Sequence, residues 1–142
     1  MVGMPRTRVY LPLSRDDVLA LAGEAALPGE ARVGHAVTAA LGRPGIVVDA
    51  EELEHEAWLL AAEAAAVGAG ADRRRVIAAA DVDPNQIREG DGVTDPSAVL
   101  VGGVVTLRDI VSFHVDEEPG GIEPTDLLWY DVTELATVVD LV

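Results

Sequence analysis

RVIAAADV, residues 75–82, is the stretch that decides the fold of this chain. It is an almost continuous apolar run with three β-branched residues, and its first polar side chain after Arg75 is Asp81. Strands covered on both faces of a sheet are apolar at successive positions, whereas half-exposed strands alternate with polar residues. The turn signal Asp83-Pro84-Asn85 ends the run. The sequence therefore predicts a central strand with a packed layer on each side.

The segment before this strand carries the clearest helix signal in the chain. Asp49 is followed three residues later by Glu52, which predicts an N-cap with a capping box. The helix should run from residue 50 to about residue 67, because apolar residues recur at one-face spacing. Those inward positions are Leu53, Ala57, Leu60, Ala61 and Ala64. Gly68 and Gly70 follow, as glycines commonly do at helix C-termini.

A strand and a shorter helix are predicted nearer the N-terminus. Residues 8–13, RVYLPL, are rich in strand formers, and Ser14 should then cap a helix from residue 15 to about residue 25. Residues 31–41 remain open between two structures, since alternating Val and His positions fit a strand while the alanines favour a short helix. Residues 46–48 are predicted to form a short strand.

Three further strands and one helix are predicted after the central strand. The strands should span residues 98–105, 110–115 and 127–130, with the last at an edge of the sheet. In the second of these, alternation should place one set of side chains on one face and one set on the other. The sets are Val111, Phe113 and Val115, and Ile110, Ser112 and His114. Asp131 and Glu134 predict a capped C-terminal helix.

The order of these elements predicts an α+β fold in a single domain spanning residues 1–142. Helices and strands do not alternate regularly, so we expect a mixed or mostly antiparallel sheet with one long and two shorter helices. A chain of 142 residues that is 49% hydrophobic can bury a core without disulfides or a structural metal. Because aromatic residues make up only 4%, this core should consist mainly of Val, Leu, Ile and Ala.

The composition also excludes several classes of site. The chain has no Cys, which rules out disulfides, cysteine-ligated zinc, iron–sulfur clusters and a thiol nucleophile. Its 25 acidic and 10 basic residues give a net charge of −15, which repels nucleic-acid phosphates and acidic lipid headgroups. The N-terminus lacks the apolar run of an export signal. We therefore expect a cytosolic protein that binds neither nucleic acid nor membrane.

Two loop motifs resemble ligand sites and fail on inspection. Gly68-Ala69-Gly70 lacks the third glycine of a phosphate loop, and it follows a helix where a strand is required. Asp81-x-Asp83-x-Asn85 has the opening spacing of a calcium loop. Gln86 and Gly92 then occupy the positions that require Gly and Glu. A helix end and a solvated turn are the better interpretations.

Two side-chain groupings have part of the pattern of a metal or catalytic site. Glu51 and Glu52 share a helix face with His55, but carboxylate metal centres of this type need ligands from several helices. Ser112 and His114 point the same way on a strand, but no third residue can be placed to orient the histidine. The sequence accordingly predicts no metal ion, no cofactor and no catalytic residue.

Two groups of residues remain as functional candidates. The candidate pocket consists of Arg8, Tyr10, His35, Thr38 and His114. The candidate interaction surface consists of Glu51, Glu52, Glu54, Glu56, Asp116, Glu117 and Glu118. The surplus of carboxylates favours a non-catalytic interaction or regulatory domain that binds a protein with a basic face. Plain solubility, a homodimer and mimicry of DNA stay open as alternatives.

Five short motifs are distinctive when taken together. They are RVYLP at 8–12, GHAVT at 34–38, EELE at 51–54, RRVIAAADV at 74–82 and LLWY at 127–130. As a set, they resemble a family of small acidic actinobacterial proteins of unknown function. The resemblance implies a cytosolic protein and supplies no activity.

A second resemblance is to the split-sheet fold of ADP-ribosyltransferases and their non-catalytic relatives. It rests on the order of elements and on the turn at 106–109 before the strand at 110–115. This resemblance implies a nicotinamide nucleotide site in which Arg8 and either Glu117 or Glu118 would take part. The alternative function is therefore a nucleotide-binding protein or an enzyme related to that fold.

Overall fold

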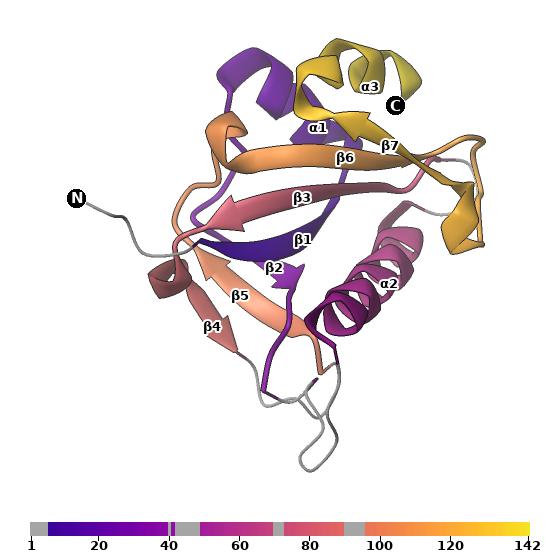
Figure 1. The fold of residues 1–142 in the computed structure, drawn as a ribbon. Helices are drawn as coiled ribbons and strands as arrows, with labels where there is room; N and C mark the ends of the chain where they lie inside the picture. The colour runs from indigo at the N-terminus through magenta and orange to yellow at the C-terminus, as the bar shows by residue number, and fades with distance from the viewer. Residues whose placement is uncertain (1–5, 40, 42–48, 70–72, 90–95) are drawn as a thin grey trace.

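The computed structural model describes residues 6–39, 41, 49–69, 73–89 and 96–142 (Figure 1). Within them, seven strands form one antiparallel sheet in the order β4-β5-β2-β1-β3-β6-β7. The strands are β1 (Thr7–Leu13), β2 (Ala31–His35), β3 (Val76–Val82), β4 (Ile87–Glu89), β5 (Ala98–Gly102), β6 (Ile110–Asp116) and β7 (Leu127–Asp131). The helices are α1 (Arg15–Glu24), α2 (Ala50–Ala69) and α3 (Leu135–Leu141), and four single 3-10 turns are η1 (Pro84–Gln86), η2 (Leu107–Asp109), η3 (Pro124–Asp126) and η4 (Val132–Glu134). The α+β prediction is confirmed, with one long and two shorter helices.

The central position of β3 follows from its apolar sequence. Its alternate residues enter two different cores, one on each face of the sheet. On one face Ile77 and Ala79 pack with the alanines of α2, and on the other Val76, Ala78 and Ala80 pack with residues of α1 and α3. Six of the seven β3 residues are buried. The predicted two-sided strand is therefore confirmed, and small side chains let α2 lie close to the sheet.

The structure decides between strand and helix for only part of residues 31–48. β2 ends at His35, and residues 36–39 and 41 form no helix, so the strand alternative holds for the first half. β2 pairs with β5 along its whole length, and this long-range pairing outweighs the local helix propensity of the alanines. The strand predicted at residues 46–48 lies outside the described residues.

Two strand boundaries differ from the sequence prediction. β5 ends at Gly102, three residues early, because Gly103 has a φ of 80° and turns the chain. The segment after the turn Asp83-Pro84-Asn85, for which the sequence predicts no strand, contains the short strand β4 paired with β5. The Gln86 side chain secures this turn, since its amide donates to the Gly102 carbonyl at 3.0 Å. Such pairing depends on contacts across the sheet, which local sequence does not encode.

The predicted alternation of β6 is wrong at its first residue. Ala79 lies opposite Ser112, but the next residue, Ala80, lies opposite Ile110. Val111 is therefore an extra residue, a β-bulge that reverses the side-chain direction before it. Ile110 consequently joins Phe113 in the core beneath α1 and α3, and not the face that carries His114.

Candidate functional site

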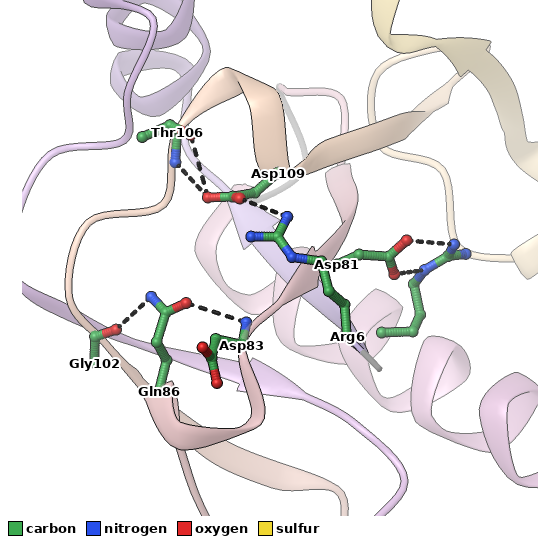
Figure 2. A network of polar contacts seen from close by, with 8 residues as sticks. Arg6, Asp81, Asp83, Gln86, Gly102, Thr106 and Asp109 are labelled. Carbon is green, nitrogen blue, oxygen red and sulfur yellow. Dashed lines mark hydrogen bonds and ion pairs between the residues drawn. The ribbon is translucent and has the colours of Figure 1, made fainter. Parts of the chain in front are cut away.

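Arg8 and Tyr10 lie on the face of β1 that α2 covers in part. They are two residues apart on the strand, and Tyr10 belongs to the core beneath α2. The Arg8 guanidinium donates two hydrogen bonds to Asp81 on β3, at 2.6 Å and 3.2 Å, and Asp81 lies directly opposite it in the sheet. Figure 2 shows the Asp81 carboxylate with both bonds. Arg8 is thus held by a bidentate carboxylate partner.

His114 extends the same face onto β6. Its ring is 5.5 Å from the Trp58 ring of α2, in an edge-on arrangement. Burial lowers the pKa of His114 to about 4, and the positive charge of Arg8 acts in the same direction. Burial raises the pKa of Tyr10, and the negative charge of Glu54 adds to that effect. Arg8, Tyr10 and His114 therefore share one electrostatic environment, in which His114 is neutral at pH 7 and Tyr10 is protonated.

The other two members of the candidate pocket, His35 and Thr38, form hydrogen bonds that connect parts of the fold. His35 lies opposite Tyr10 in the β1–β2 pairing, and its Nδ1 shares a 2.9 Å hydrogen bond with the Ser97 hydroxyl. The Thr38 hydroxyl donates to the Pro96 carbonyl and accepts from the Leu41 backbone N–H. Both side chains are buried. They tie the segment after β2 to the start of β5.

The buried His35–Ser97 pair was not predicted from the sequence. The two residues are 62 positions apart, so only the β2–β5 pairing brings them together. A serine beside a histidine is the core of a nucleophilic site, but such a serine must reach a substrate. Ser97 has 0% exposure and His35 has 2%. In this state the pair is a structural contact.

The acidic surface candidates divide into exposed and buried residues. Glu51, Glu52 and Glu54 are exposed on the first turns of α2, and Glu56 is half-buried. Glu117 and Glu118 are exposed as well, but they follow β6 near the opposite end of α2 (Figure 1). The predicted residues therefore do not form one continuous patch.

The prediction that Asp116 belongs to an exposed interaction surface is wrong, because this residue is buried and forms an ion pair. The Arg75 guanidinium donates to its two carboxylate oxygens at 2.8–3.2 Å, and the Arg75 backbone N–H donates at 2.7 Å. Arg75 also donates to the carbonyls of Ile122 and Glu123, which brings the following loop over the pair. A side chain at Gly121 would bring Cβ within 2.7 Å of the Asp116 Cγ, so only glycine lets the loop close. Sequence reasoning missed this because polar loops usually leave their carboxylates in solvent.

The motif residues considered for metal binding have structural partners or lie free in solvent. Asp83 caps η1 by accepting from the Asn85 backbone N–H at 2.9 Å. The Gln86 Oε1 in turn accepts a hydrogen bond from the Asp83 backbone N–H at 3.2 Å. Figure 2 shows the contact between Gln86 and Asp83 beside a second cluster in which Asp109 accepts from Arg6 and Thr106. No group of three or more His, Asp or Glu residues in the described part of the chain could hold a metal ion.

Comparison with known proteins gives a family and no activity. Residues 7–121 match DUF6912, a family of unknown function. The chain belongs to this family. The matched range runs from the start of β1 into the loop after β6, so β7 and α3 lie beyond the DUF6912 match. No curated protein and no solved structure matches the chain. Among the described helices, none is long and apolar enough to cross a bilayer.

This DUF6912 chain also contains a cavity that the sequence did not indicate. Its volume is about 890 Å³, and it lies where the end of β1, the start of β3 and the C-terminal half of α2 meet. Its described lining residues are Pro12, Leu13, Ser14, Arg15, Asp16, Asp17, Ala64, Ala65, Arg73, Arg74, Val76, Pro119, Leu141 and Val142. None of the five predicted pocket residues is among them. The only sequence signal was the run Arg73-Arg74-Arg75, which reads locally as the polar end of a strand.

Proposed function

We propose that this protein is a non-catalytic binding domain that contacts a protein with a basic surface through the exposed glutamates of α2. The supporting observation is the charge of that helix. α2 contains five glutamates, one histidine and no arginine or lysine. Glu51, Glu52, Glu54 and Glu63 are exposed. No described cation lies within ion-pair distance of any of these four, because the described arginine pairs all involve aspartates.

An unpaired acidic face carries an energetic cost in the free protein. Exposed helices commonly place a cation four residues from each glutamate, and like charges at this spacing destabilise a helix by about 0.2–0.5 kcal/mol per pair. Glu51 and Glu54, three residues apart on the helix, are exposed like-charged neighbours. The helix dipole offsets the cost only in the first turn. A basic partner would relieve the remaining repulsion and would be attracted from a distance.

The contacts of Arg8 favour a binding domain over the nucleotide-handling alternative. A phosphate at Arg8 would have to displace a bidentate carboxylate that is already in place. The same acidic α2 face disfavours a homodimer through this surface, since two copies would repel each other. The absence of Cys is in keeping with action in the cytosol.

The test is affinity capture from an extract of the native host at about 50 and 500 mM salt. We expect the unmodified protein to retain one discrete basic partner at low salt and to lose it at high salt. The triple variant E51Q/E52Q/E54Q should lose it at both. If duplex DNA displaces the captured partner, the protein acts as a DNA mimic.

A matched control separates specific binding from total charge. Glu24, Glu30 and Asp140 are exposed carboxylates outside α2, so E24Q/E30Q/D140N removes the same three charges. This control should retain the partner at low salt. Equal capture by the α2 variant, or equal loss in the control, would contradict the proposal.

A further inference from the structure

The cavity beside the β1 C-terminus concentrates positive charge in a strongly acidic protein. Arg15, Arg73 and Arg74 line it, although the whole chain has only ten basic residues against 25 acidic ones. Arg15 begins α1, and Arg73 and Arg74 precede β3. Figure 1 shows that the end of α2 and the start of β3 lie on the same side of the molecule. Such a local reversal of sign is the electrostatic signature of a site for an anion.

The partners of the arginines distinguish this group from the others. Arg6, Arg8, Arg32 and Arg75 each pair with an aspartate within 3.1 Å. The three cavity arginines have no ion pair with any carboxylate in the described ranges. Arg74 donates only to the backbone carbonyls of Leu141 and Glu117, and its buried Nε has no described partner. These hydrogen bonds hold the Arg74 guanidinium in place and leave its charge uncompensated.

The charge balance of the lining stays positive when the acids are counted. Asp17 is neutralised by Arg32 at 3.1 Å, and its carboxylate also caps α1 through the Ser14 backbone N–H. Asp16 remains as an exposed negative group. Even with a carboxylate at Val142 added, three cations face two anions.

The remaining lining residues indicate what kind of molecule the cavity could hold besides a negative group. Pro12, Leu13, Val76, Leu141 and the α2 alanines give the cavity an apolar wall. Volumes between about 300 and 1,000 Å³ suit a small organic molecule rather than a bare ion. We infer that this cavity binds a small organic anion, with a phosphate or carboxylate group at Arg15, Arg73 and Arg74 and an apolar body against the wall. This inference is independent of the α2 proposal.

The test is calorimetric titration of the full chain with four probes. They are 1-naphthyl phosphate, 2-naphthoate, the neutral 1-naphthol and inorganic phosphate. We expect saturable 1:1 binding of at least one naphthyl anion. 1-Naphthol and inorganic phosphate should each bind at least tenfold more weakly, because 1-naphthol lacks the negative charge and inorganic phosphate lacks the apolar ring system. The two anions together reveal whether the site prefers a phosphate or a carboxylate.

The variant R15Q/R73Q tests the location without disturbing the fold. Both side chains are exposed and make no described hydrogen bond, whereas Arg74 holds the Leu141 carbonyl and is left intact. We expect at least a tenfold loss of affinity. R88Q/R108Q removes the same charge from two exposed arginines outside the cavity that form no ion pair with any described residue, and it should change affinity less than twofold. Binding that is equal for 1-naphthol, equally weakened by both variants, or absent for both anions would overturn the inference.

Discussion

Asp116 and Arg75 show how far a single residue can depart from what its sequence context suggests. The Asp116 side chain has 0% exposure and the Arg75 side chain has 4%. A buried ion pair is not strong evidence of net stabilisation, because desolvation offsets the attraction. Removing one partner is different, since it leaves an uncompensated charge in the interior. The pair also holds the loop at residues 121–123, so its loss should be felt beyond the two side chains.

We predict that Asp116→Ala lowers the free energy of unfolding by about 3–5 kcal/mol, measured by urea denaturation. The matched control is Asp81→Ala, which breaks the Arg8 pair, where both side chains are 35% exposed. Partly exposed pairs contribute up to about 1 kcal/mol. A loss for Asp116→Ala no larger than that of the control would show that the pair is not buried as described.

His114 gives the fold a dependence on pH that can be tested. Its pKa is about 4 in the folded protein and 6.5 in its ordinary state, so the folded chain favours neutral imidazole. The contribution of neutral His114 to the stability of the fold is fully present above pH 6.5. It is lost as the pH falls from 6.5 towards 4, because the unfolded chain takes up a proton in this range while the folded chain does not. The loss at the lower end amounts to about 3 kcal/mol.

We predict that His114→Gln flattens the fall in stability between pH 6.5 and 4.5, measured by urea unfolding at several pH values. The slopes are compared rather than the absolute stabilities, because the substitution also changes packing against Trp58. His55→Gln serves as the control, since His55 is exposed. Parallel pH profiles for the unmodified protein and His114→Gln would contradict the account.

At the scale of elements, local signals were sufficient for helix starts. Ser14 and Asp17 form the capping box of α1, and Asp131 with Glu134 forms that of η4 before α3. These are contacts over three residues, which a sequence shows directly. The β6 bulge and the strand β4 were missed because each is set by a partner strand elsewhere in the chain. The boundaries of α2 were predicted to within two residues.

Asp49 supports the long helix at its first turn. Its carboxylate accepts from the Glu51 backbone N–H at 3.2 Å, which satisfies one of the unpaired donors at the helix start. We predict that Asp49→Ala lowers the free energy of unfolding by about 1 kcal/mol, and that Asp49→Ser largely retains it. Thermal unfolding followed by circular dichroism measures both. An equal loss in the two variants would mean that the cap is not the cause.

At the scale of the whole molecule, sequence predicted the layers better than the sites. The two cores on either side of β3 follow from its apolar run, and Arg8, Tyr10 and His114 do share a face. The arginine-lined cavity could not be predicted, because Arg15 and Arg73 are 58 positions apart and meet only through the packing of α2 and the sheet. Asp116 was misplaced for the same reason, since its partner lies 41 positions away.

The exposed glutamates of α2 are the proposed binding surface, and amide chemical-shift mapping of the isotope-labelled protein with its captured partner tests this most directly. The account predicts that the largest changes fall on residues 51–63 and disappear as salt is raised. Changes centred on Arg8, Tyr10 and His114, with the amides of α2 unaffected, would contradict it.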